Sequence, residues 1–150
     1  MTLDEPLLRK LADWRPAGDP QELSVSDQSG RRVTLRADHV DVVGCRLWEL
    51  TLSGPAPADL KARAEAVSAR AAGLLEPLRL LEVDAEHGAL LRSATPSDRG
   101  GARHYYEARL SAGGVLSLRR YRAASAEARR EQVAFTLTHD ALGQLVAELA

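Results

Sequence analysis

The feature of this sequence that most restricts its fold is a change of hydrophobic period along the chain. In several stretches apolar and polar residues alternate one by one, which is typical of strands that bury one face. Three other stretches repeat their apolar residues every three to four positions, as amphipathic helices do. The pattern predicts an α+β fold, in which a mainly antiparallel sheet is accompanied by a short N-terminal helix, one long central helix and a C-terminal helix.

The three helices are predicted from these apolar stripes and from the residues that flank them. The first is expected to begin at Asp4, which can cap it, and to end before Pro16. The second is expected over residues 58–75, because Pro77 cannot continue a helix. The third follows Thr138, whose hydroxyl is suited to cap its first turn.

Strands are expected on both sides of the central helix, and glycine-containing turns join two pairs of them into hairpins. The predicted strands are residues 22–26, 32–36, 40–44, 47–52, 78–83, 89–94, 104–111, 115–121 and 133–138. Residues 96–101 are predicted to form a loop, and residues 123–131 either a helical turn or a mobile connection. We expect one domain over residues 1–150, with a weak organisation into two sheet-plus-helix units, about 21–76 and 77–150.

Composition restricts the class of protein. A chain of 150 residues can bury enough surface to fold without disulfides or metals, and its 45% hydrophobic and 27% charged residues are ordinary globular values. The one cysteine cannot form an internal disulfide, and no stretch approaches the ~20 apolar residues of a membrane span. We therefore expect a cytoplasmic protein. Only Lys10 and Lys61 among the 20 basic residues are lysines, an excess of arginine that a GC-rich bacterial genome would explain.

Residues that carry catalysis or bind metals show no recognisable spacing. The four histidines, His39, His87, His104 and His139, lie far apart in the sequence and form no metal-binding pair with one another or with Cys45. The chain also lacks a nucleophile elbow, a phosphate-binding loop and a dinucleotide fingerprint. The sequence therefore predicts no catalytic, cofactor or metal site, and a protein that is not an enzyme.

The most distinctive segment is residues 92–130, which contains nine arginines but only three acidic residues. Tyr105, Glu107 and Arg109 are expected on one side of their predicted strand, and Arg120 and Arg122 share a side of theirs. A sheet face that mixes guanidinium groups and tyrosines can bind anions or stack bases. The candidate residues for this anion, nucleic-acid or partner face are Arg103, Tyr105, Arg109, Arg119, Arg120 and Arg122. The alternative is an ordinary solvated face, in which Glu107 neutralises a neighbour across the strands.

In the order of its predicted elements the chain resembles the small dimeric chaperones of bacterial protein secretion. That resemblance implies a homodimer that binds extended segments of a client protein. A doubled sheet-plus-helix unit is similar to Whirly and PUR-type proteins, which implies single-stranded nucleic-acid binding. The primary hypothesis is a non-catalytic binding or adaptor protein with a protein partner. The alternatives are nucleic-acid binding, and an enzyme or sensor with a small-molecule pocket between sheet and helices.

Overall fold

Alternating apolar and polar residues build a single antiparallel sheet, and the helical stripes pack against it. The computed structural model describes residues 3–71, 74, 76–124 and 129–150. Within them lie three helices and ten strands, which confirms the predicted α+β fold. The helices are α1 (Asp4–Leu11), α2 (Leu60–Arg70) and α3 (His139–Leu149). The strands are β1 (Gln21–Ser26), β2 (Arg32–Val40), β3 (Gly44–Ser53), β4 (Leu78–Asp84), β5 (Gly88–Ser93), β6 (Ser97–Arg99), β7 (Ala102–Ser111), β8 (Val115–Ala123), β9 (Glu131–Val133) and β10 (Phe135–Thr138).

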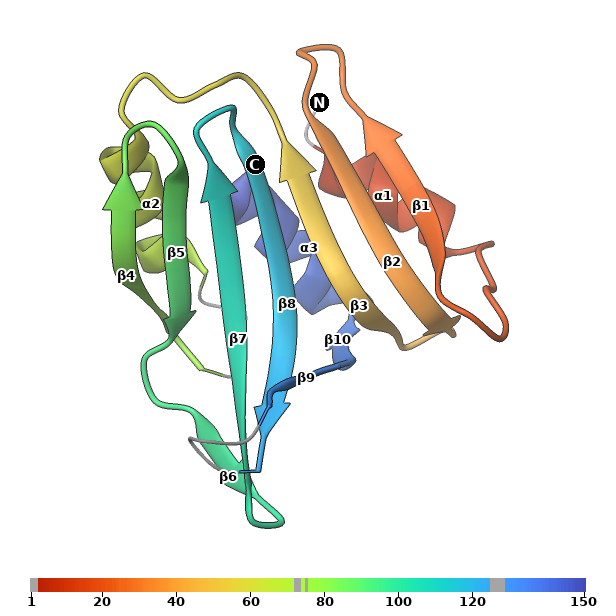
Figure 1. The fold of residues 1–150 in the computed structure, drawn as a ribbon. Coiled ribbons are helices and arrows are strands. Elements are labelled where there is room, and N and C mark those ends of the chain that lie inside the picture. The colour runs from red at the N-terminus through yellow and green to blue at the C-terminus, as the bar shows by residue number, and fades with distance from the viewer. Residues whose placement is uncertain (1–2, 72–73, 75, 125–128) are drawn as a thin grey trace.

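The sheet consists of two meanders joined along one pair of strands (Figure 1). Its strand order is β1-β2-β3-β8-β7-β5-β4, so the first block of strands meets the second where β3 pairs with β8. That pairing is antiparallel and matches Leu50 with Leu118 and Leu52 with Leu116. The two sheet-plus-helix units expected from the sequence therefore share one sheet.

Strands β3 and β8 separate beyond this pairing, and short strands occupy the space between them. Strand β9 pairs with the last part of β8, whereas β10 pairs with the first part of β3. The side-chain amide of Gln132 on β9 donates a hydrogen bond of 2.6 Å to the carbonyl of Trp48 on β3. Strands β9 and β10 thus occupy the space that opens between β8 and β3, and the chain then continues into α3.

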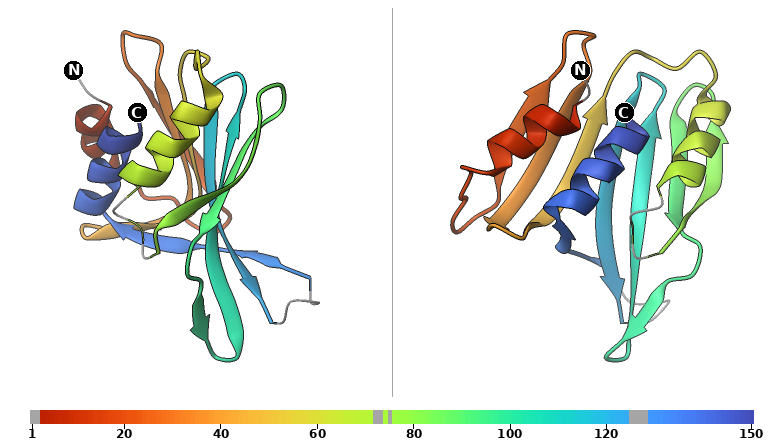
Figure 2. Two further views of the ribbon diagram at one scale, coloured as in Figure 1. Left: turned by 90° about the vertical axis from the view of Figure 1, so that its left-hand side faces the viewer. Right: turned by 180° about the vertical axis from the view of Figure 1, so that it is seen from behind.

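All three helices lie on the same face of the sheet, and no helix of the described residues lies over the opposite face (Figure 2). Helix α2 packs on β4 and β5, and α3 lies between α2 and α1. Asp59 and Thr138 cap α2 and α3 by accepting hydrogen bonds from backbone amides, as expected for Thr138. The core fills the space between the helices and the sheet. Its largest fully buried side chains are Leu7, Leu11, Leu35, Leu47, Leu50, Leu91, Leu110, Leu142, Leu145, Val33, Val67 and Val146.

One predicted strand and one predicted helix cap near the N-terminal meander are wrong. Residues 40–44 are not a strand of their own, because β2 continues to Val40 and the chain then turns. The carboxylate of Asp41 accepts hydrogen bonds from the amides of Val43 and Gly44, and this closes the turn. The first helix does begin at Asp4, but its cap position is Leu3, so Asp4 is not the capping side chain.

Further along the chain, other elements differ from the prediction. The strand expected over residues 133–138 is interrupted at Ala134, which separates β9 from β10. Helix α2 spans Leu60–Arg70 rather than residues 58–75, and residues 72–73 and 75 lie outside the described part. The predicted loop at 96–101 contains the short strand β6, which pairs with β7. The segment 123–131 was expected to be a helical turn or a mobile connection. Its residues 125–128 are not described, and its end already belongs to β9.

Candidate functional site

The helix-free face of the sheet carries a group of arginine and tyrosine side chains on β5, β7 and β8. The register of β7 and β8 places Glu107 opposite Arg119 and Tyr105 opposite Tyr121. Paired residues of antiparallel strands share a face, so all four belong to the same surface. We call this surface the arginine face. Its residues are Arg92, Arg103, Tyr105, Glu107, Arg109, Arg119, Tyr121 and Arg130.

A single carboxylate lies at the centre of the arginine face. Glu107 accepts hydrogen bonds from Nε of Arg92 at 3.0 Å and from a terminal nitrogen of Arg130 at 2.8 Å. Arg109 contacts its other oxygen at 3.4 Å. The Glu107 side chain is only 2% exposed, whereas the three arginines remain between 34% and 66% exposed. Three guanidinium groups therefore surround one buried negative charge.

This arrangement keeps Glu107 ionised. Burial raises the pKa of its carboxyl group, but hydrogen bonds from Arg130 and Arg92 outweigh the burial, so the pKa lies below its ordinary value. The pKa of Arg130 is raised in turn, mainly because Glu107 accepts its hydrogen bond. Glu107 therefore holds the arginines in place as a permanent anion at neutral pH.

The two tyrosines of the arginine face are already in contact with cations of the chain. The rings of Tyr105 and Tyr121 are tilted against each other, with 6.0 Å between their centroids. The guanidinium carbon of Arg130 lies 3.9 Å from the centroid of Tyr121, and that of Arg92 lies 5.8 Å from the centroid of Tyr105. Both contacts are within cation–π range. Tyr121 is consequently only 8% exposed, and its ring face is not available to a ligand.

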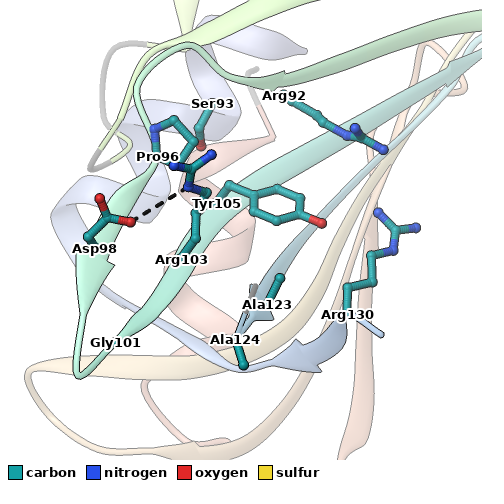
Figure 3. A pocket seen from close by; sticks show the side chains of 10 residues that line it. All are labelled: Arg92, Ser93, Pro96, Asp98, Gly101, Arg103, Tyr105, Ala123, Ala124 and Arg130. Atoms are coloured by element: carbon teal, nitrogen blue, oxygen red, sulfur yellow. Dashed lines mark ion pairs between the residues drawn. The ribbon is translucent and has the colours of Figure 1, made fainter. Parts of the chain in front are cut away.

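A hollow of about 550 Å³ lies beside Tyr105 on this face. Figure 3 shows Arg92 and Arg130 extending from opposite sides towards the region of the Tyr105 hydroxyl. Arg103 forms the far wall, where it pairs with Asp98 at 3.6 Å. The residues that line the hollow are Arg92, Ser93, Pro96, Asp98, Gly101, Arg103, Tyr105, Ala123, Ala124 and Arg130. The hollow therefore combines several N–H donors and a phenol, which suits an anionic group.

The arginine face belongs to a charged row that crosses all seven main strands. Strand registers and the ion pair between Arg119 and Glu49 connect the members of the row. From β4 to β1 they are Arg79, Arg92, Glu107, Arg119, Glu49, Arg36 and Glu22. Signs alternate from β7 to β1, but two arginines stand next to each other at the β4 end. The positive excess is therefore concentrated on the half of the sheet formed by β4, β5 and β7.

The structure brings together four of the six candidate residues. Arg103, Tyr105, Arg109 and Arg119 lie on the arginine face. Arg120 does not, because it is opposite Tyr106 on the helix side of the sheet and only 7% exposed. Arg122, two residues further along β8, points to the same side as Arg120 and is exposed there.

Two arginines of the face, Arg92 and Arg130, were not among the sequence candidates. The alternation of Leu91, Arg92 and Ser93 along β5 does indicate that Arg92 points away from the core. No comparable signal exists for Arg130, which precedes β9 and reaches Glu107 only because β9 pairs with β8. Its position depends on tertiary structure.

Behind the sheet, Arg120 belongs to a different polar cluster. Its guanidinium forms two contacts with the carboxylate of Glu76 and lies 4.3 Å from the ring centroid of Tyr106. Tyr106 in turn makes an edge contact with Phe135. Arg120, Tyr106 and Phe135 border a hollow of about 580 Å³ between the sheet, α3 and Leu74. This is where a small-molecule pocket between sheet and helices would lie, but the charge of Arg120 is already matched by Glu76.

The residues considered for catalysis and metal binding lie outside the arginine face, and two of the histidines, His39 and His139, both contact Asp41. Cys45 is buried, and burial together with the nearby Asp41 raises the pKa of its thiol to about 12. His39 and His87 each contact one aspartate, Asp41 and Asp84 respectively. Within the described part of the chain, no three histidine, cysteine or acidic residues gather as a metal ion would require.

Comparisons with known proteins do not extend these observations. The chain matches no protein-family model, no curated protein and no solved structure. None of the helices in the described ranges is both long and apolar enough to cross a membrane.

Proposed function

We propose that this chain is a non-catalytic binding protein that holds an acidic, extended segment of a partner protein on its arginine face. The observation that carries the proposal is the cluster of Arg92, Arg109 and Arg130 around the buried carboxylate of Glu107. It lies on a sheet face that no helix covers (Figure 2). A positively charged, preorganised and accessible surface is what an acidic partner needs.

Charge counting supports an anionic ligand. The three arginines around Glu107 leave an excess of two positive charges, whereas Arg103 and Arg119 are each matched by one carboxylate. A guanidinium has five N–H donors, and each contact to Glu107 uses only part of this capacity. The remaining donors suit carboxylate groups, which guanidinium binds in a bidentate geometry.

The tyrosines favour a protein partner over single-stranded nucleic acid. Binding of single strands draws much of its energy from bases that stack on free aromatic faces. Here Arg130 lies over Tyr121, and Arg92 lies at the edge of cation–π range from Tyr105. The rings therefore serve to hold the arginines in place. The secretion chaperones that the chain resembles in the order of its elements bind extended segments of client proteins. A similar carrier role for this chain is a narrower version of the same proposal.

The proposal is tested by fluorescence anisotropy with labelled probes at low ionic strength. The probes are an extended peptide of alternating glutamate and serine, its glutamine counterpart, and an oligothymidylate of the same net charge as the acidic peptide. We expect the acidic peptide to bind and the glutamine peptide not to bind. Added salt should weaken the binding, because the interacting charges are exposed.

A pair of variants locates the binding site. In Arg92→Gln/Arg109→Gln, two charged donors are lost from the arginine face, and we expect the affinity for the acidic peptide to fall by about tenfold or more. The matched control, Arg9→Gln/Lys61→Gln, removes two exposed charges on α1 and α2 and should bind as the unaltered protein does. Equal affinity in the two variants would refute the proposal. Tighter binding of the oligothymidylate than of the peptide would replace it with nucleic-acid binding.

A further inference from the structure

Strand β4 forms one edge of the sheet, and its outer side has no strand partner among the described residues. Figure 1 shows no strand on the outer side of β4, and α2 lies behind this strand on the helix side of the sheet. It also exposes two large apolar side chains, since Leu81 is 43% and Val83 is 38% exposed. The opposite edge, β1, is different because its exposed residues are polar or acidic. Exposed apolar residues on an unpaired edge are a template for pairing with another strand.

The pairing of β4 with β5 determines which β4 side chains share a face. Leu80 is opposite Leu91 and Glu82 is opposite Leu90, so Leu81 is an extra residue in a bulge. Because of this bulge, Arg79 and Glu82 both lie on the helix-free face although they are three residues apart. Leu78, Leu80 and Val83 lie on the helix side.

We propose that a second copy of this chain pairs with β4 in the antiparallel direction, about a two-fold axis between Leu80 and Leu81. This register places Leu80 of one copy opposite Leu81 of the other, and Leu78 opposite Val83. It also places Arg79 of one copy opposite Glu82 of the other on the helix-free face. Each contact occurs twice, because an interface with two-fold symmetry uses the same surface on both copies.

Charge complementarity selects a second copy as the occupant. Within the described chain, neither Arg79 nor Glu82 forms an ion pair or a side-chain hydrogen bond. Arg79 is in addition opposite Arg92 on β5, and like charges across a strand pair are unfavourable. The proposed register brings Glu82 of the other copy next to Arg79. Arg79 and Glu82 then each have a partner of opposite charge, and the exposed side chains of Leu81 and Val83 are covered.

The dimer would extend the sheet across the axis. Neighbouring strands lie about 4.8 Å apart, so the helix-free faces of the two copies would form one continuous surface. The arginine face begins on β5, directly next to β4, and the two arginine faces would therefore flank the axis. A ligand with two binding segments could engage both copies and gain affinity. The dimer itself does not depend on what the arginine face binds.

The oligomeric state and its dissociation constant are measured by sedimentation velocity over a concentration series, with circular dichroism as the check of folding. We expect the unaltered protein to be a dimer. Arg79→Glu and Glu82→Arg, as single variants, each turn two opposite-charge contacts into like-charge contacts. Each should raise the dissociation constant by about tenfold or more.

Mixing provides the decisive comparison. An equimolar mixture of the Arg79→Glu and Glu82→Arg proteins has opposite charges at both contacts of the mixed dimer. We therefore expect heterodimers to form in native mass spectrometry where neither variant dimerises alone, and the double variant Arg79→Glu/Glu82→Arg to recover dimerisation. This recovery cannot arise from a loss of folding.

The apolar contacts of the interface are tested separately, with a matched control variant. Leu81→Lys should abolish the dimer, whereas Val43→Lys, at an exposed apolar residue of the turn between β2 and β3, should leave it intact. A monomeric unaltered protein at high concentration would overturn the proposal. A dimer that survives the single charge variants, or a mixture that forms no heterodimer, would also overturn it. Loss of peptide binding alone would affect only the proposed function.

Discussion

Arg120 on β8 and Glu76 just before β4 form a buried ion pair with two contacts, of 3.0 and 3.2 Å. Their side chains are 8% and 5% exposed. Ser93 and Ser97 donate further hydrogen bonds to the Glu76 carboxylate, so both of its oxygens are satisfied. The pair thereby links the segment after α2 to the middle of the sheet, from the side opposite the arginine face.

Removing Arg120 should therefore be costly. In Arg120→Leu the carboxylate of Glu76 stays buried without its cation, and we expect the free energy of unfolding to fall by about 3–5 kcal/mol. Arg122→Leu is the matched control, because Arg122 is exposed on the same side of the same strand, and its effect should stay within about 0.5 kcal/mol. Urea denaturation followed by circular dichroism measures both. Similar losses in the two variants would show that the buried pair contributes no special stability.

Acid should destabilise the protein through two buried carboxylates of the described residues, those of Glu76 and Glu107. For Glu76 and Glu107, burial raises the pKa, but the arginine hydrogen bonds lower it by more, so both pKa values lie below the ordinary 4.5. A group with a lowered folded pKa contributes stability above its unfolded pKa and loses it as the pH falls through the folded value. We expect the free energy of unfolding to decrease steeply below about pH 4.5.

The Glu107→Gln variant measures how much of this loss of stability in acid comes from Glu107 on the arginine face. It lacks the titrating group, so its stability should fall less steeply with acidification than that of the unaltered protein, even though it starts lower at neutral pH. Chemical denaturation at a series of pH values between about 3 and 7 gives the two slopes. Identical slopes would mean that Glu107 has the same pKa in the folded and the unfolded chain.

Gly114, in the turn between β7 and β8, should not tolerate a side chain. Its φ angle is +97°, and a Cβ atom there would lie 2.7 Å from the carbonyl oxygen of Pro55. Gly114→Ala should therefore cost about 1–3 kcal/mol of unfolding free energy. Gly113→Ala is the control, since its Cβ would meet only the hydroxyl of Ser111 at 3.8 Å. Thermal unfolding compares them, and equal midpoints would contradict the close approach of the two loops.

Cys45 should be chemically inert in the folded protein. Its residue is 1% exposed and the pKa of its thiol is raised to about 12, so almost no thiolate exists at neutral pH. We expect an aromatic disulfide reagent to react with it far more slowly in buffer than in denaturant. Absorbance of the released thiolate follows both reactions. Rapid labelling without denaturant would show that the segment around β10, which covers Cys45, opens readily.

Local patterns were enough to predict most strands and their hairpins. The alternation in β7 and β8 and the glycines between them indicated the pair correctly, because alternation and turn chemistry involve only neighbouring residues. The turn at Asp41 was missed, although it too involves only neighbouring residues. Val40, Val42 and Val43 favour a strand by composition, but the hydrogen bonds of the Asp41 side chain close a turn there.

The sequence by itself showed that arginines and tyrosines are concentrated in β7 and β8 and that these strands form a hairpin. The alternation of Leu116 and Leu118 with Ser117 also indicates the buried side of β8, and with it the open side on which Arg119 lies. Only the tertiary structure decided that Arg120, on the buried side, meets Glu76, and that Arg130 arrives beside Glu107. The physical reason is that alternation involves neighbouring residues of one strand, whereas these ion pairs join segments that are far apart in the chain.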